Sequence, residues 1–476
     1  MVAAALTAVL ACSAPGVAAA GDTTGSAGVG DTFFPKSGNG GYDVTAYKVR
    51  LDYDPRRNRF RRGTKTVVKA VSTQPAGLTR FNLDYRGPGI RSLRVFDLSD
   101  PQTVYGERFR RDGQELIVKL DELLPFDSEF GVRVRYRGRP HAITDPDGSR
   151  EGWVRTDDGA AVVGEPRGTP TWMPANDHPT DKATFEVSIG VPPNHTAVSN
   201  GALEEVDTDD PEQSIYRWSE DDPMATYLAT ATVGKFDVLE QTGLPGNPAS
   251  EYIAVDRRFD EDVGATDRNL EIIDHFELSF GSYPYDETGA IIDHAPRLGY
   301  ALEVQTKPFY PSRPGNVLVS HELAHQWWGN NVTLDDWSQI WLNEGFATWA
   351  EWWWTEGDGG QSVGGQVASL CQSPGGNDHL WEPPPGSVPG PKRMFDNAVY
   401  ERGGMALQAL RELIGDEAFF ELLETWGQAN GDPHETVNTG DLIELVKTIS
   451  PVPGEEIDEL FDDWVFDEGK PEGCSG

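Results

Sequence analysis

Asn316-Val-Leu-Val-Ser-His-Glu-Leu-Ala-His-Gln-Trp-Trp-Gly329 is the stretch that organises the rest of the chain. Pro314 lies just before it and Gly329 ends it, which predicts one helix. Residues four positions apart share a helix face, so His321 and His325 can aim two imidazoles at one point. Two histidines at this spacing are typical of a zinc site, which needs a third protein ligand and leaves a fourth position for water or substrate.

Glu344 is the best candidate for the third ligand. It lies in Trp341-Leu-Asn-Glu-Gly-Phe-Ala-Thr-Trp349, a second segment with a helical pattern. The sequence therefore predicts one zinc ion per chain, bound by His321, His325 and Glu344. Glu322 follows the first histidine and points off the histidine face, where a carboxylate can take a proton from zinc-bound water as a general base. The alternative is a surface helix with two satisfied histidines, which the acid on the second helix disfavours.

The composition is that of a globular protein large enough for two or three domains. The chain has 476 residues, of which 38% are hydrophobic and 10% aromatic, and its net charge is −37. Phosphate binding needs clustered Lys and Arg, so this charge argues against nucleic acid and anionic membrane surfaces as partners. It fits a soluble protein that repels its own copies.

Residues 1–20 are apolar and rich in small side chains, which predicts a signal for secretion or for attachment to the cell envelope. Val9-Leu-Ala-Cys12 resembles a lipobox, which would leave a lipid anchor on Cys12. Ala18-Ala-Ala20 resembles a cleavage site that would instead remove Cys12, and both processing routes remain open. No later stretch is long and apolar enough to cross a membrane.

Two further cysteines, Cys371 and Cys474, lie in the second half of the chain. In an oxidising compartment they could pair and attach the C-terminus to the domain that holds the two histidines. Two free thiols are the other possibility.

The chain divides into four parts. The signal at 1–20 is followed by a predicted flexible linker at 21–40, rich in Gly, Ser and Thr. From 41 to 240, apolar and polar residues alternate repeatedly, which predicts a β domain of sandwich or saddle type. From 241 to 476 the pattern is mostly helical. The predicted fold class is α+β, with a helix over 261–280 and an irregular segment over 356–393.

Four motifs now resemble a known family. They are the histidine segment with its following Asn343-Glu-Gly, Gly299-Tyr-Ala-Leu-Glu303, Val399-Tyr-Glu-Arg-Gly403, and the Pro-rich loop that begins at Glu165. Together they resemble the zinc aminopeptidases of the aminopeptidase N and leukotriene-hydrolase type, in a short two-domain form. The resemblance covers about residues 41–466. It implies a saddle-like β domain followed by a thermolysin-like catalytic domain.

The resemblance also implies a role for each matching residue. His321, His325 and Glu344 correspond to the zinc ligands and Glu322 to the general base. Tyr400 corresponds to the hydroxyl that stabilises the oxyanion. Glu303 and Glu165 correspond to the acids that bind the free α-amino group of a peptide substrate.

The chain departs from the family pattern in a few places. The signature before Glu303 has Tyr300 in place of a glycine and Leu302 in place of a methionine, and Arg402 stands where lysine is common. Tyr300 and Leu302 predict that the pocket for the substrate's first side chain has a different shape. Arginine in place of lysine at position 402 is predicted to have a mild effect. The expected function is a secreted zinc aminopeptidase that acts on peptides with a free N-terminus. A thermolysin-type endopeptidase, or a catalytically silent binding protein on the same fold, are the alternatives.

Overall fold

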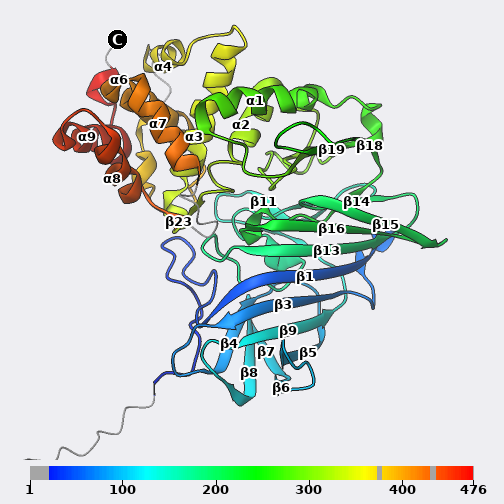
Figure 1. The fold of residues 1–476 in the computed structure, drawn as a ribbon. Coiled ribbons are helices and arrows are strands. Elements are labelled where there is room, and N and C mark those ends of the chain that lie inside the picture. Colours follow the sequence, from blue (N-terminus) through cyan, green and yellow to red (C-terminus); the bar gives the residue numbers. More distant parts are fainter. Residues whose placement is uncertain (1–20, 373–377, 429–435, 475–476) are drawn as a thin grey trace, which may run out of the picture.

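The computed structural model describes residues 21–372, 378–428 and 436–474. The predicted α+β class is confirmed, because strands dominate the first half of the chain and helices the second (Figure 1). The predicted signal at 1–20, including Cys12, lies outside the described residues. Among the described ranges, the structure contains no helix that is long and apolar enough to cross a membrane.

The N-terminal domain is built on a nine-stranded sheet with the order β15-β16-β13-β1-β3-β9-β5-β6, and β2 pairs with the end of β1. Along β1, Tyr47, Val49 and Leu51 are buried and Arg50 is exposed, so the alternation in the sequence places one face of the sheet in the core. The strands of this sheet are β1 (Tyr42–Asp54), β2 (Arg59–Phe60), β3 (Lys65–Ser72), β5 (Ile90–Asp97), β6 (Val104–Gly106), β9 (Glu129–Tyr136), β13 (Ala183–Val191), β15 (Ala202–Asp210) and β16 (Gln213–Met224).

Two smaller sheets complete this domain. One has the order β4-β8-β7 and the other β10-β11-β12-β17-β14. The first packs on the large sheet through aromatic rings, since the ring of Phe81 lies 5.4 Å from that of Tyr42 and 5.5 Å from that of Phe130. Their strands are β4 (Leu78–Asp84), β7 (Arg108–Asp112), β8 (Glu115–Leu124), β10 (Ala142–Thr144), β11 (Arg150–Arg155), β12 (Ala160–Val163), β14 (Thr196–Val198) and β17 (Thr232–Gly234).

The second domain begins with a four-stranded sheet of order β18-β19-β20-β21. Its strands are β18 (Phe236–Thr242), β19 (Ser250–Asp256), β20 (Glu287–Ile292) and β21 (Phe309–Tyr310). A separate two-stranded sheet consists of β22 (Thr333–Leu334) and β23 (Thr436–Val437). The predicted boundary at residue 240 therefore falls inside β18. Since β18 pairs with β19, and β19 with β20, the sheet belongs with the helices that follow it.

Helices form the rest of the second domain (Figure 1). They are α1 (Asn269–Phe280), α2 (Asn316–Ala324), α3 (Trp341–Gly357), α4 (Val363–Gln372), α5 (Asp378–Trp381), α6 (Gly403–Ile414), α7 (Asp416–Gly427), α8 (Thr439–Ile449) and α9 (Gly454–Phe461). The helix predicted from 261 begins only at Asn269. The segment 356–393, predicted to be irregular, contains α4 and α5. Its glycines obscured the helical pattern, but Val363 and Cys371 are buried on one side of α4.

The prediction that residues 21–40 form a flexible linker is wrong. This arm lies against both domains, and Phe34 is buried. Oδ2 of Asp31 accepts hydrogen bonds from the Trp337 backbone N–H (2.7 Å) and from Nε2 of His178 (3.2 Å). The Thr32 backbone N–H donates to Asp336. A small-residue composition gives no sign of such distant partners, which is why the sequence pattern was misleading.

The Pro-rich segment 164–182 is mostly buried and joins the two domains. Ala175 forms a β-bridge with Asp84, and the Asn176 backbone N–H donates to the Tyr47 hydroxyl at 2.9 Å. These contacts hold the middle of the segment on the β domain. Near Glu165, the Arg167 backbone N–H donates to the Glu151 carboxylate at 2.9 Å, and at the other end Lys182 donates to the Asn331 carbonyl oxygen of the second domain at 2.6 Å.

Cys371 and Cys474 form a disulfide with a Cα–Cα distance of 5.3 Å. The sequence left open whether these cysteines pair or remain free thiols, and in the structure they are paired. Lys470 donates to the Cys371 carbonyl at 2.8 Å, which gives the C-terminal segment a second contact at the end of α4.

Arg402 is fully buried at the end of a π-helical turn, Ala398–Arg402, that precedes α6. Its guanidinium donates hydrogen bonds of 2.6–2.9 Å to the carbonyl oxygens of Trp381, Trp464, Asp463 and Asp467. The arginine thus attaches the turn that carries Tyr400 to the end of α5 and to residues 463–467 near the C-terminus.

Candidate active site

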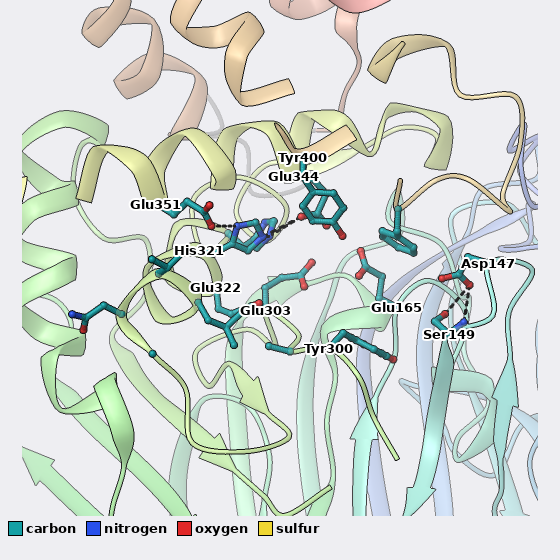
Figure 2. Close-up of a pocket in the computed structure, with 17 residues that line it drawn as sticks. Asp147, Ser149, Glu165, Tyr300, Glu303, His321, Glu322, Glu344, Glu351 and Tyr400 are labelled. Atoms are coloured by element: carbon teal, nitrogen blue, oxygen red, sulfur yellow. Dashed lines mark hydrogen bonds and ion pairs between the residues drawn. The ribbon is translucent and has the colours of Figure 1, made fainter. Parts of the chain in front are cut away.

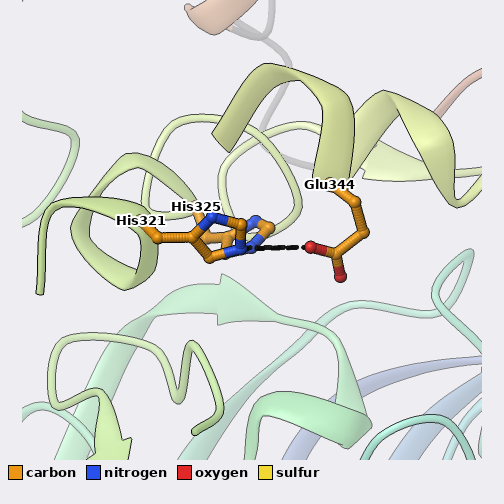
Figure 3. A group of neighbouring side chains, drawn as sticks. All are labelled: His321, His325 and Glu344. Atoms are coloured by element: carbon orange, nitrogen blue, oxygen red, sulfur yellow. Dashed lines mark hydrogen bonds and ion pairs between the residues drawn. The ribbon is translucent and has the colours of Figure 1, made fainter. Parts of the chain in front are cut away.

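Helices α2 and α3 bring the three predicted ligands together. Helix α2 ends at Ala324 and not at Gly329 as predicted, because the chain folds into tight turns after His325. His325 keeps helical backbone angles (φ −58°, ψ −21°) as the residue that ends the helix. The four-residue spacing to His321 therefore survives, and both imidazoles face Glu344 in the first turn of α3 (Figure 3).

The three ligand atoms form a nearly equilateral triangle. Nε2 of His321 lies 3.2 Å from Nε2 of His325 and 3.2 Å from Oε2 of Glu344, and the third side, from His325 to Glu344, is 3.4 Å. A tetrahedral zinc ion with bonds of about 2.0–2.1 Å holds its ligand atoms about 3.3–3.4 Å apart. The donor set and its spacing thus fit one zinc ion, the cofactor that the sequence predicts.

Hydrogen bonds orient both histidines for this task. Nδ1 of His321 lies 3.1 Å from Oε2 of Glu351, and Nδ1 of His325 lies 3.1 Å from the Trp328 carbonyl oxygen. When each Nδ1 donates to its oxygen, each Nε2 keeps its lone pair for a metal. Burial opposes ionisation of Glu344, but the two histidines outweigh it and lower the pKa of that carboxyl to about 2. The third ligand is therefore a carboxylate at neutral pH.

Glu322 lines the same pocket from α2 (Figure 2). It is 5% exposed, and burial raises the pKa of its carboxyl to about 8 despite the two histidines beside it. Carboxylate oxygens of Glu322 and Glu303 and a nitrogen of His325 all lie within 4.8 Å of one another. The predicted base is therefore next to the metal ligands and can exchange a proton near neutral pH.

Tyr400 faces the ligands from the π-helical turn. Its ring stacks on that of His321, with centroids 6.0 Å apart and an interplanar angle of 23°. Burial and the neighbouring acids raise the pKa of its hydroxyl well above the usual value. Tyr400 therefore keeps its proton and can donate a hydrogen bond into the pocket.

Glu303 and Glu165 approach the pocket from the two domains, at 2% and 8% exposure (Figure 2). One carboxylate oxygen of each has no hydrogen-bond partner among the residues that the structure describes. Burial and the mutual repulsion of nearby acids raise the pKa of both groups. Asn330 donates to the Glu303 backbone carbonyl at 2.8 Å and so fixes that residue in place.

All seven predicted site residues line one cavity of about 680 Å³. Among the described residues, its lining contains six carboxylate residues and no Lys or Arg. Sequence reasoning missed the remaining polar lining residues, which are Asp147, Ser149, Asn316 and Glu351. Glu351 follows Glu344 by two helical turns, so its position could have been found from the helix pattern, whereas Asp147 and Ser149 come from a β-turn without any motif.

Two family models match the chain. The peptidase M1 N-terminal domain matches residues 44–228 and the peptidase family M1 domain matches residues 305–464. The chain belongs to peptidase family M1. Both models agree with the two-domain organisation and with the resemblance found in the four motifs.

Solved M1 structures share the whole architecture. The M1 zinc metallopeptidase from Deinococcus radiodurans has a TM-score of 0.79 and 27% identity, and the alignment covers 94% of this chain and 99% of that one. A mutant of the same enzyme bound to a Tyr-Ser-Ala substrate has a TM-score of 0.78 and 28% identity, with 93% and 98% covered. These neighbours are zinc metallopeptidases, which agrees with the zinc cofactor and the peptidase class predicted for this M1 chain.

Curated M1 relatives are much longer. Aminopeptidase M1-D of Oryza sativa subsp. japonica is 27% identical over 324 residues, which cover 63% of this chain and 36% of that protein. Glutamyl aminopeptidase of Rattus norvegicus is 26% identical over 431 residues, with 80% and 43% covered. The chain thus spans between a third and a half of the length of these two relatives.

Proposed function

We propose that this M1 protein is a zinc aminopeptidase that hydrolyses the first peptide bond of peptides with a free N-terminus. The observation that carries the proposal is the pair of buried carboxylates, Glu303 and Glu165, beside the His-His-Glu group. Within the described ranges, no Lys or Arg forms an ion pair with either acid, and a protonated α-amine is the ligand that complements two such buried acids. An acetylated or internal peptide would leave both carboxylates desolvated and unpaired.

The side chains divide the reaction among them. A zinc ion at His321, His325 and Glu344 supplies Lewis acidity, which activates water and polarises the scissile carbonyl. Glu322 takes the proton from the attacking water and passes it to the leaving nitrogen, which departs as an amine. The Tyr400 hydroxyl donates a hydrogen bond to the carbonyl oxygen as negative charge develops there.

A paired assay tests the specificity for a free N-terminus. Zinc-loaded protein is given fluorogenic amino-acid amides and the same compounds after N-acetylation. We expect the free compounds to react about 10⁴-fold faster, because a site built for a polar group rejects an analogue that lacks it. Chelation should abolish the reaction, and Glu303→Gln should lower kcat/KM for the free compounds while the zinc content stays unchanged.

Other outcomes would refute the proposal. Comparable cleavage of acetylated substrates would favour the thermolysin-type endopeptidase. No cleavage of either set by the zinc-loaded protein would favour a binding protein on this fold.

Tyr400→Phe tests the oxyanion role. Removing one such donor typically lowers the rate about 100- to 1,000-fold. We expect this loss in kcat, with KM and zinc content close to those of the unaltered protein, because the phenyl ring can keep its stacking on His321. A kcat within a factor of a few of the original would show that another group stabilises the oxyanion.

We also propose that the protein acts outside the cytoplasm. The Cys371–Cys474 disulfide supports an oxidising compartment. Mass spectrometry of the mature N-terminus after expression in a bacterial host distinguishes the two processing routes, since a lipidated Cys12 and a start at Gly21 differ in mass. An unprocessed N-terminus in the cytoplasmic fraction would contradict export.

A further inference from the structure

Positive charge is concentrated at one end of the nine-stranded sheet, although the chain as a whole is strongly acidic. The segments 50–65, 91–94 and 133–139 contain thirteen of the 40 Lys and Arg residues of the chain, and twelve of the thirteen are arginine. The same segments contain two acids, Asp52 and Asp54, out of 77 in the chain. We call the thirteen basic residues of these segments the basic end.

Strand pairing brings the segments together and places like charges opposite each other (Figure 1). Lys65 of β3 lies directly opposite Arg50 of β1 on one side and Arg135 of β9 on the other. In the next row, Arg133 of β9 lies opposite Arg94 of β5. Burial and three of these arginines lower the pKa of Lys65. Like charges directly opposite each other destabilise a sheet, so this arrangement costs stability and points to a role in binding.

The rest of the chain does little to neutralise this charge. Arg61 pairs with Asp52 at 2.7 Å and Arg57 with Asp54 at 3.9 Å, and within the described ranges no other residue of the basic end forms an ion pair. Ten of the thirteen side chains are exposed. At physiological salt, exposed charges more than about 8 Å apart are largely screened from each other, so acids elsewhere on the surface do not cancel this local excess. The basic end is therefore available to an anionic partner.

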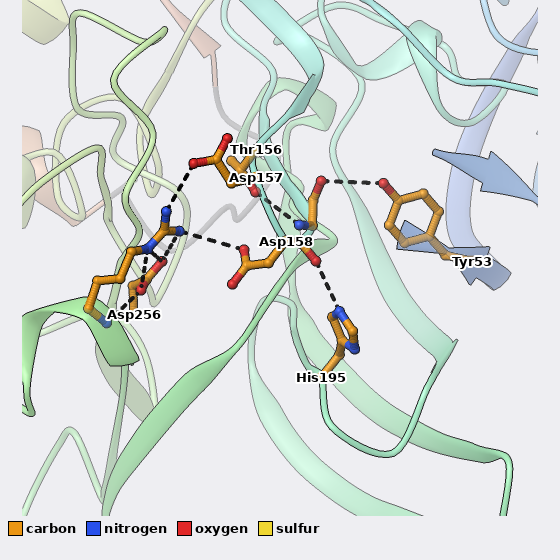
Figure 4. A network of polar contacts seen from close by, with 8 residues as sticks. Tyr53, Thr156, Asp157, Asp158, His195 and Asp256 are labelled. Atoms are coloured by element: carbon orange, nitrogen blue, oxygen red, sulfur yellow. Dashed lines mark hydrogen bonds and ion pairs between the residues drawn. The ribbon is translucent and has the colours of Figure 1, made fainter. Parts of the chain in front are cut away.

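The arginine-rich loop between β1 and β3 is fixed from the inside. Oδ1 of Asn58, in the middle of this loop, accepts hydrogen bonds from the Tyr53 hydroxyl (2.9 Å) and from Nε1 of Trp153 (3.1 Å). Figure 4 shows Tyr53 with its hydroxyl directed at a neighbouring turn, where it lies 3.4 Å from the Gly159 carbonyl oxygen. The exposed arginines of the loop thus extend from a backbone that the protein interior holds in place.

A cavity of about 380 Å³ lies at the basic end. Arg91, Arg94, Arg133 and Arg135 line it, and Glu107 is the one acid of its described lining. A guanidinium group can bind two oxygens of one phosphate through parallel hydrogen bonds. The predominance of arginine and the cavity between the guanidinium groups therefore suit phosphate groups.

The layout of these charges fits a broad anionic surface. They are spread over β1, β3, β9 and β5, and four adjacent strands at a spacing of about 4.8 Å span about 14 Å. A membrane presents a layer of phosphate headgroups to a patch of this breadth. None of the thirteen residues lines the peptidase cavity, so the contact does not involve the peptidase site.

The start of the described chain agrees with such a partner. The Asp22 carbonyl oxygen accepts a hydrogen bond from Gln74 in the turn after β3, which places this part of the chain next to the large sheet. A lipid on Cys12, one of the two predicted processing routes, would therefore attach the membrane only ten residues before a fixed contact with the β domain.

We propose that the basic end binds the surface of membranes that contain anionic phospholipids. Lys and Arg close to such a surface are attracted to its negative charge, and the attraction falls off within a Debye length. Net charge, on which the expectation against anionic membranes rested, averages over the whole molecule and does not describe this end of the sheet.

Co-sedimentation with lipid vesicles tests the proposal. Protein that starts at Gly21 is one of the two predicted mature forms, contains both domains and lacks the apolar segment 1–20 as a second membrane contact. We expect it to bind vesicles of phosphatidylcholine and phosphatidylglycerol in equal parts at physiological salt, and not vesicles of phosphatidylcholine alone. Binding should be lost at about 1 M salt, where the Debye length is about 3 Å.

Charge reversal identifies the surface. Arg50→Glu combined with Arg135→Glu should weaken vesicle binding at least about tenfold, because each basic residue near the membrane contributes to the attraction. The unfolding temperature should not fall, since both substitutions place an acid opposite Lys65 where like charges stood. Hydrolysis of soluble amino-acid amides should be unchanged. The matched control is Arg80→Glu with Arg297→Glu, two exposed arginines outside the basic end, which should bind vesicles as the unaltered protein does.

Several results would overturn the proposal. Absence of binding to the mixed vesicles would remove it directly, and equal binding to phosphatidylcholine alone would assign the contact to apolar groups. Equal weakening in the Arg80 and Arg297 control would mean that total charge, and not the basic end, decides binding. Binding of duplex DNA without binding of vesicles would assign the basic end to a nucleic acid.

Discussion

Glu322→Gln is expected to lower kcat about 100- to 10,000-fold, the usual contribution of a positioned general acid–base group. The amide has nearly the same size and can keep the packing of the buried side chain, but it cannot accept a proton from water. His321, His325 and Glu344 remain in place, so zinc content and unfolding temperature should not change. Rates on free amino-acid amides, with metal analysis of the same samples, provide the measurement.

The control for this experiment is Glu421→Gln, an exposed acid on α7 that loses the same charge and does not line the cavity. It should have normal activity. A Glu322 variant that keeps more than about a tenth of the activity would assign the proton transfer to another group. A variant that loses zinc together with activity would show that Glu322 supports the metal site and would leave its role as a base without support.

Arg402→Met is expected to lower the free energy of unfolding strongly. The arginine donates to four backbone carbonyls from a fully buried position. A buried acceptor left without a partner costs about 1–3 kcal/mol. The bond to Trp464 is buried and the other three are partly buried, so the free energy of unfolding should fall by at least about 2 kcal/mol. Urea unfolding followed by tryptophan fluorescence measures this difference.

Arg402→Lys provides the comparison and tests the sequence-based expectation that lysine and arginine are nearly equivalent here. A single ammonium cannot reach four carbonyls arranged around a planar guanidinium. We therefore expect the free energy of unfolding of the lysine variant to lie between that of the unaltered protein and that of the methionine variant. Equal stability of the lysine variant and the unaltered protein would confirm the mild effect. A loss below about 1 kcal/mol in the methionine variant would mean that water replaces the guanidinium.

Local patterns carried most of the predictable information. The alternation of Tyr47, Val49 and Leu51 identified β1 because one face of that strand is buried and the other is not. The spacing of His321 and His325 identified the ligand pair because it depends only on helix geometry. All seven site residues were found in this way or through the four motifs, and the structure brings them to one cavity.

Features that depend on distant partners escaped prediction. Asp31 bonds to Trp337 across more than three hundred residues, and nothing in the composition of 21–40 indicates it. Asp158, in the turn between β11 and β12, likewise lies close to Asp256 and Asp293, which are at the ends of β19 and β20. Single aspartates at the ends of strands resemble ordinary turn residues until the sheets place them side by side.

The Cys371–Cys474 bond has a topological consequence. It closes the chain between these two positions, 103 residues apart, into a covalent ring that contains Tyr400 and Arg402. A single break in the backbone anywhere in that ring leaves both pieces joined. In an oxidising environment, therefore, a nick in the C-terminal helices cannot release the tyrosine-bearing turn from the zinc-binding helices.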